Sequence, residues 1–194
     1  MEIHPTGTLK LPSSVLTIGA FDGVHRGHQA LILKTKEQAK AHGVPCVVYT
    51  FDPPPKVHFK KGQLITSLDE KLNRLKALGV DYVIVGKFIE SFMNKTVSAF
   101  IEELQFIHPV EIWEGPCFQF GKGRSGTIED LKTHFHVGVL HPMQCEQGEI
   151  ISSTRIRSLL KQGNFSLAKS LLGDIRSISF LEERNYAGTA MKAN

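Results

Sequence analysis

The residues best suited to chemistry lie in the segment GAFDGVHRGHQ, at positions 19–29. Its three glycines allow the backbone to approach a ligand closely, and an amphipathic stretch follows at once. The amides and the positive dipole end of a helix start favour an anion such as phosphate. His25 and His28 are three positions apart, so both side chains can address one phosphate group. For this segment alone, a glycine-rich turn with two structural histidines remains the alternative.

A second segment, ISSTRIR at positions 151–157, also suits phosphate. Ser152 or Ser153 can cap a helix, and the first amides of that helix can hold an anion. Thr154 and Arg157 would share one helical face, and the planar guanidinium of arginine can bind phosphate at two points. Taken alone, this segment is equally compatible with an ordinary capped helix that carries solvated arginines.

Considered together, these segments resemble a known family. GxFDGVHxGHQ is similar to the HxGH signature of the nucleotidyltransferase superfamily, in the form found in the adenylyltransferase domain of bacterial FAD synthetases. ISSTRIR matches the ISSTxxR pattern of the same superfamily. FDPPPKVHF, at positions 51–59, resembles the family's proline-rich flavin-site loop, and GPCFQFGKGRSG, at 115–126, resembles its GxDFxFG or GxNFxFG loop. The resemblance covers positions 17–173.

The resemblance implies in-line transfer of AMP from MgATP to FMN, which gives FAD and pyrophosphate without a covalent enzyme intermediate. Magnesium would be held chiefly by phosphate oxygens and water. The implied catalytic residues are His25, His28, Ser153, Thr154 and Arg157. The implied ATP contacts are Gly19, Ala20, Phe21, Gly27, His28, Ser152, Ser153, Thr154 and Arg157. The implied FMN contacts are Asp22, Asp52, Pro53, Pro55, Phe59, Cys117 and Phe120, although each phenylalanine taken alone could instead be a core residue.

Two positions depart from the family pattern. Pro54 stands where the family usually has histidine, and Cys117 stands where it usually has aspartate or asparagine; cysteine orients polar substrate atoms poorly. Two alternatives therefore stay open. The chain could transfer an adenylyl or cytidylyl group to another phosphorylated small molecule, which flavin binding would distinguish. It could also be a regulatory paralogue that binds nucleotide or flavin, which turnover would distinguish.

The elements that must position these residues follow from the pattern of apolar residues. Apolar, β-prone runs predict strands at about 15–21, 45–51, 81–88, 110–113 and 137–143. Amphipathic stretches with capping signals predict helices at about 27–41, 68–78, 97–106, 127–135, 152–163 and 166–172, with Ser67 and Glu70 as a capping box. This alternation predicts an α/β fold with a Rossmann-like parallel sheet flanked by helices, and ligands beyond the carboxyl ends of its strands.

Composition restricts the remaining possibilities. The length of 194 residues and the hydrophobic content of 41% predict one globular domain over 1–173 and a loosely packed tail over 174–194. This length leaves no residues for the riboflavin kinase domain that the usual bacterial enzyme carries. We therefore expect a monofunctional enzyme. No signal peptide or membrane span is evident, which indicates a cytoplasmic protein. The net charge of +4 is spread among acidic residues, which favours small anionic substrates over nucleic acid. Three widely spaced cysteines indicate reduced thiols. The oligomeric state is left open.

Overall fold

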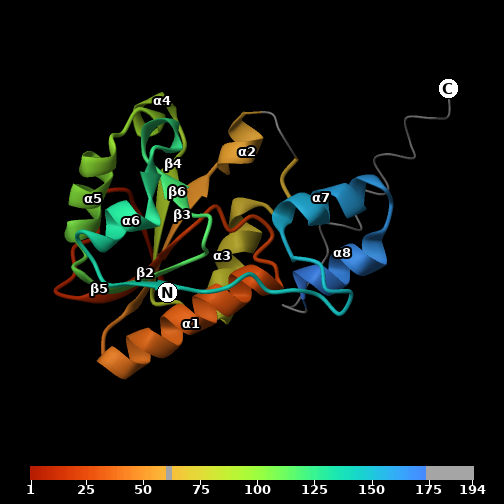
Figure 1. Ribbon diagram of the computed structural model, residues 1–194, viewed down its shortest axis with the longest axis horizontal. Helices are drawn as coiled ribbons and strands as arrows, with labels where there is room; N and C mark the ends of the chain where they lie inside the picture. The colour runs from red at the N-terminus through yellow and green to blue at the C-terminus, as the bar shows by residue number, and fades with distance from the viewer. Residues whose placement is uncertain (60–62, 174–194) are drawn as a thin grey trace.

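The computed structural model describes residues 1–59 and 63–173, which form a six-stranded parallel sheet flanked by helices (Figure 1). The strands lie in the order β1-β4-β3-β2-β5-β8, and each neighbouring pair is parallel. This architecture confirms the predicted α/β fold. The strands of the sheet are β1 (Glu2–Pro5), β2 (Ser14–Ile18), β3 (Cys46–Asp52), β4 (Tyr82–Lys87), β5 (Pro109–Glu114) and β8 (Val137–Val139).

Strand β2 occupies the middle of the sheet, between β3 and β5. All five of its residues are buried because helices cover both faces, which accounts for its apolar composition. The strand order reverses at β2: β3, β4 and β1 lie on one side of it, and β5 and β8 on the other. In open parallel sheets a ligand crevice forms at such a reversal, beyond the carboxyl ends of the strands. Here those ends are Ile18 and Glu114.

The helices form two layers over the sheet. Alternate residues of β3 point to opposite faces: Tyr49 packs with helices α5 and α6, whereas Val48 packs with α1 and α3. Figure 1 shows the same separation, and the blue helices α7 and α8 form their own pair beside the sheet. The helices are α1 (Arg26–His42), α2 (Pro55–His58), α3 (Leu68–Ala77), α4 (Glu90–Met93), α5 (Val97–Gln105), α6 (Ile128–Lys132), α7 (Ser153–Lys161) and α8 (Phe165–Leu172).

The structure differs from the sequence prediction at the edges of the sheet. Strand β1 was not predicted, because a four-residue exposed edge strand has little pattern of its own and depends on pairing with β4. Strand β8 is three residues long, and α6 ends at Lys132 before the predicted position 135. Ser67 caps α3, as predicted, but Glu70 pairs with Arg74 and does not complete the capping box.

Two segments predicted as irregular contain short elements. The proline-rich segment includes helix α2, which begins at Pro55, where the missing amide hydrogen costs no helical bond. The glycine-rich segment includes an antiparallel pair, β6 (Gln119–Phe120) and β7 (Gly126–Thr127), with a 3₁₀ turn, η1 (Lys122–Arg124), between them. The predicted tail, 174–194, lies outside the described residues. No helix in the described ranges combines the length and apolar content needed to span a bilayer.

Candidate active site

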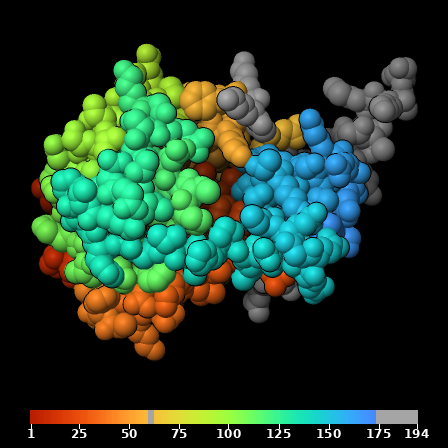
Figure 2. Space-filling model, in the orientation of Figure 1, coloured from red at the N-terminus to blue at the C-terminus, as the bar shows by residue number. Residues whose placement is uncertain are grey.

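A cavity of about 1000 Å³ lies where the strand order predicts it, beyond the ends of β2 and β5. Figure 2 shows the corresponding recess between the green part of the surface and the blue part formed by α7 and α8. The loop after β2, the start of α7, helix α2 and the loop after β5 all contribute to its wall. The four segments singled out in the sequence therefore meet around one space.

His25 and His28 lie side by side at the start of α1. Their rings stack with centroids 3.6 Å apart and an interplanar angle of 17°. The backbone N–H of His28 donates to Nδ1 of His25 at 3.3 Å, so His25 caps the helix. Nδ1 of His28 is buried and has no hydrogen-bond partner within the described part of the chain. Each ring therefore keeps hydrogen-bonding capacity that this part of the chain leaves unused.

Both histidines are neutral at physiological pH. Burial and, to a smaller extent, the charge of Arg157 lower the pKa of His25 from 6.5 to about 4. Burial also lowers the pKa of His28 well below its ordinary value, with His25, Lys71 and Arg157 adding to the effect. The two neutral rings can therefore donate hydrogen bonds from ring N–H groups to phosphate, and neither ring carries a charge before a ligand binds.

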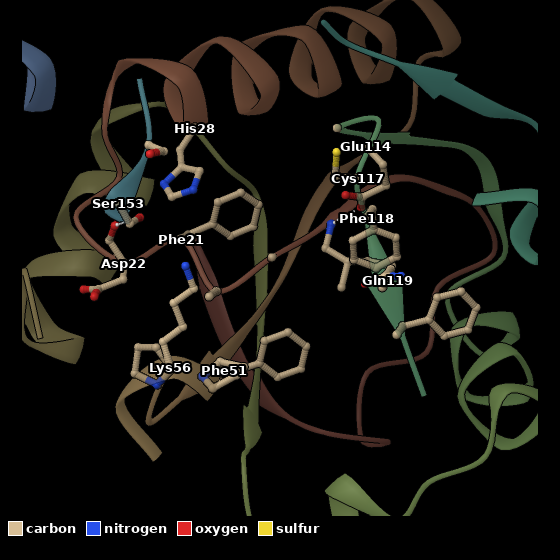
Figure 3. A pocket seen from close by; sticks show the side chains of 18 of the residues that line it. Phe21, Asp22, His28, Phe51, Lys56, Glu114, Cys117, Phe118, Gln119 and Ser153 are labelled. Atoms are coloured by element: carbon tan, nitrogen blue, oxygen red, sulfur yellow. Dashed lines mark hydrogen bonds between the residues drawn. The ribbon is translucent and has the colours of Figure 1, made fainter. Parts of the chain in front are cut away.

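The start of α7 is joined directly to the loop after β2, although the two are far apart in sequence. Ser152 caps α7 by accepting from the backbone N–H of Arg155, which resolves the two capping possibilities. Ser153 Oγ donates to the backbone carbonyl of Asp22 at 3.0 Å, across 131 residues. The histidines and the first turn of α7 thus face a common part of the cavity, as the labelled His28 and Ser153 show in Figure 3.

Arg157 and Asp22 form a buried ion pair that fixes this junction. The Asp22 carboxylate also accepts from the backbone N–H groups of Ile65 and Thr66, and Arg157 Nε donates to the Gln63 carbonyl at 2.8 Å. These bonds hold Asp22 on the histidine side of the cavity. The sequence resemblance had implied that Asp22 contacts FMN. Its position fits a role in orienting Arg157.

Lys71 is a buried residue of α3 that sequence reasoning missed. Its Nζ donates to the backbone carbonyls of Ala20 and Phe51, at 3.1 and 2.8 Å, and so links the loop after β2 to the end of β3. Burial lowers the pKa of Lys71 from 10.5 to about 8, against the opposing effect of the charges on Asp22 and Asp52. A lysine on the buried face of an amphipathic helix is the one sequence signal that could have identified it.

The opposite side of the cavity is aromatic. Phe51, Phe88 and Phe92 pack with ring centroids 5.2–6.1 Å apart, and Phe118 stacks on Phe120 at 5.8 Å. Phe120 is both a core residue and part of the cavity wall, because one side of its ring packs on the main hydrophobic core. Flat apolar walls of this kind suit a planar ring system.

The residues expected beside FMN are placed unequally. Pro55, Phe59, Cys117 and Phe120 line the cavity, as does Pro54. Asp52 and Pro53 are not among its lining residues; they form the turn at the end of β3, where their peptide bond is cis. Of the residues expected to contact ATP, all line the cavity: Gly19, Ala20, Phe21, Gly27, His28, Ser152, Ser153, Thr154 and Arg157.

Comparison with known proteins agrees with this arrangement. The FAD synthetase family pattern matches residues 8–155, more than half of the chain. The chain belongs to the FAD synthetase family. Among its FAD synthetase relatives, a protein of Geobacillus thermodenitrificans, named a putative bifunctional riboflavin kinase/FMN adenylyltransferase, is 42% identical over 174 residues, which cover 89% of this chain and 97% of that protein.

A second relative, the bifunctional riboflavin kinase/FMN adenylyltransferase of Escherichia coli K12, is 37% identical over 187 residues. The match covers 91% of this chain but 59% of the Escherichia coli protein. The fold is similar to the crystal structure of a Streptococcus pneumoniae protein that is named a macrolide-efflux protein. The two chains are 32% identical in sequence, and their structures superpose with a TM-score of 0.78. That match covers 88% of this chain and 60% of the Streptococcus pneumoniae protein. The family resemblance and the fold inferred from the sequence are thereby confirmed.

Proposed function

We propose that this chain transfers the adenylyl group of MgATP to FMN and releases FAD and pyrophosphate. One observation carries the proposal: the stacked histidines and the start of α7 converge on one side of a cavity whose other side is lined by phenylalanines. Such a cavity offers hydrogen-bond donors for phosphates and flat walls for a flavin ring. The activities named for the relatives support the same reaction.

In this reaction a phosphate oxygen of FMN attacks the α-phosphorus of ATP, and the bond from that phosphorus to the β-phosphate bridging oxygen breaks. A phosphate monoester is largely ionised at pH 7, so the nucleophile needs no protein base. The neutral rings of His25 and His28 would donate hydrogen bonds to the phosphates. Ser153, Thr154 and Arg157 would hold the departing pyrophosphate, whose growing charge a guanidinium stabilises.

Substrate binding would rearrange one contact at the cavity mouth. Lys56 Nζ donates to Thr154 Oγ1 at 2.6 Å, which connects α2 to α7 across the cavity. Burial lowers the pKa of Lys56, and the positive charges of Arg157 and Arg124 lower it further. These three cations would attract anionic substrates, and a bound polyphosphate would replace Thr154 as a partner of Lys56.

Magnesium would enter with ATP. Within residues 1–59 and 63–173 no three histidine, cysteine or acidic side chains are grouped so that they could hold a metal ion. A Mg²⁺ ion readily keeps phosphate oxygens and water as ligands, so such a cage is not required. We therefore treat the ion as part of the MgATP substrate.

Two alternatives follow from Pro54 and Cys117, namely another phosphorylated acceptor and a catalytically weak regulatory paralogue. We propose that this polypeptide is monofunctional, with adenylyl transfer and no riboflavin phosphorylation; the family match over residues 8–155 and the six-stranded α/β sheet of the described residues support this proposal. A cytoplasmic location is part of the same proposal, and cell fractionation would test it.

The test is to incubate the purified chain with FMN or riboflavin and with MgATP or MgCTP, then separate the flavins chromatographically. We expect FAD to form only in the incubation that contains FMN and MgATP. A product with CTP but not ATP would favour the alternative transferase. Tight flavin or nucleotide binding without turnover would favour the regulatory paralogue. Conversion of riboflavin to FMN would contradict the monofunctional proposal.

A further inference from the structure

Glu114 is a buried acidic residue to which the reaction above assigns no role. It is the last residue of β5 and is 2% exposed. The pairing of β2 with β5 ends at Leu16 and Ile112, and beyond it the backbone N–H of Ile18 donates to Oε1 of Glu114 at 2.6 Å. The side chain therefore lies at the strand-order reversal, where the two strands diverge and the cavity begins.

The carboxyl group of Glu114 lacks a compensating charge. No lysine, arginine or histidine in the described part of the chain forms an ion pair with it; the bond from Ile18 is its one hydrogen bond there. Burial raises the pKa of Glu114 well above its ordinary value, and the Ile18 bond opposes this only in part. Burial thus favours the neutral acid, which has one O–H donor and a remaining lone pair on Oε1.

The neighbours of Glu114 indicate what kind of group it would meet. Glu114 lines the cavity together with Cys117, Phe118 and Gln119. Figure 3 shows these residues across the cavity from His28, Asp22 and Ser153. The expected phosphates therefore lie on the far side, and the near side combines aromatic surface with a donor and an acceptor.

We infer that Glu114 determines specificity for the acceptor by hydrogen-bonding the polar edge of its isoalloxazine ring. This inference rests on the proposed function. The O–H of the acid would donate to a ring carbonyl, while Oε1 would accept from the adjacent imide N–H as well as from Ile18. A site built to pair with such an edge rejects analogues that lack it, because its own buried groups are then left unpaired.

Two substitutions separate this role from a structural one. Glu114→Gln keeps a donor and an acceptor in the same shape, so the KM for FMN should change by less than about threefold. Glu114→Met keeps a similar side-chain length but removes both groups, so the KM for FMN should rise roughly 10- to 100-fold while the KM for ATP stays unchanged. Glu111→Met is the matched control, since Glu111 is buried in the same strand but does not line the cavity. It should leave both KM values unchanged.

A ligand analogue provides a test that requires no variant. FMN methylated at the imide nitrogen cannot donate to Oε1, so the wild-type chain should bind it at least about tenfold more weakly than FMN, measured by quenching of flavin fluorescence. Equal binding of the two flavins, or a Glu114→Met variant with an unchanged KM for FMN, would overturn the inference, as would a rise in the KM for ATP instead. Because the binding measurement needs no turnover, a wild type that binds FMN selectively but makes no FAD would contradict the proposed function and support the role of Glu114.

Discussion

Replacement of Asp22 by asparagine tests the junction between the two phosphate-binding segments. Asp22 is 1% exposed and pairs with Arg157, whose side chain is 14% exposed. Removing one charge of a buried pair typically costs about 3–5 kcal/mol. The asparagine oxygen can still accept from Ile65 and Thr66, and Arg157 keeps its bond to Gln63. We therefore expect the free energy of unfolding to fall by about 2–3 kcal/mol, below that range.

The kinetic consequence distinguishes a positioning residue from an FMN contact. If Asp22 orients Arg157, Asp22→Asn should raise the KM for ATP or lower kcat, with little change in the KM for FMN. Urea unfolding and initial rates at varied ATP and FMN provide both measurements. A double-mutant cycle with Arg157→Gln should give a coupling of more than about 1 kcal/mol in stability. A rise in the KM for FMN alone, or additive stability losses, would refute this reasoning.

Three further predictions concern single residues. His28→Ala should lower kcat by roughly two to three powers of ten in a folded protein, because one phosphate contact is lost, and near-normal turnover would remove His28 from the catalytic residues. Because the pKa of folded His25 is about 4 and its unfolded value is 6.5, the unfolded state binds more protons between these values, and stability falls as pH is lowered through this window. The free energy of unfolding lost through His25 is about 3 kcal/mol, so urea titrations at pH 7 and pH 4 should show a correspondingly smaller loss for His25→Asn than for the wild type. An equal loss in both proteins would contradict the low pKa of His25. Cys117→Asn, which restores an amide beside the cavity, should turn over FMN at least as fast as the wild type with little change in ATP binding, and abolished activity would contradict this account of the position.

Local signals in the sequence located most of the sheet and the helices. The buried strands β2 and β3 form from largely apolar, β-prone runs, and the capping residues Ser67 and Ser152 begin helices where they were expected. Strand β1 was missed because its exposed residues carry no apolar pattern and it forms by pairing with β4. The short strands β6 and β7 likewise depend on each other, and isolated two-residue runs have no readable periodicity.

The site was predicted in the same uneven way. The histidines and the ISSTRIR segment were identified because glycines, capping residues and a family resemblance all marked them. Lys71 and Glu114 were missed because their roles arise from burial and from partners distant in sequence, at Ala20 and Ile18. The resemblance implied that Asp22 contacts FMN, and this stays a prediction; its pairing with Arg157, across 135 residues, has no local signal in the sequence.

The most direct test of the central claim follows the fate of the α-phosphorus of ATP. The purified chain would be incubated with FMN, Mg²⁺ and ATP carrying a radioactive α-phosphorus, and the labelled products would be separated and counted with the pyrophosphate released. We expect the label in FAD, with one pyrophosphate formed for each FAD. Label that stays in ATP or appears only in free AMP, with FMN unchanged, would contradict adenylyl transfer to the flavin.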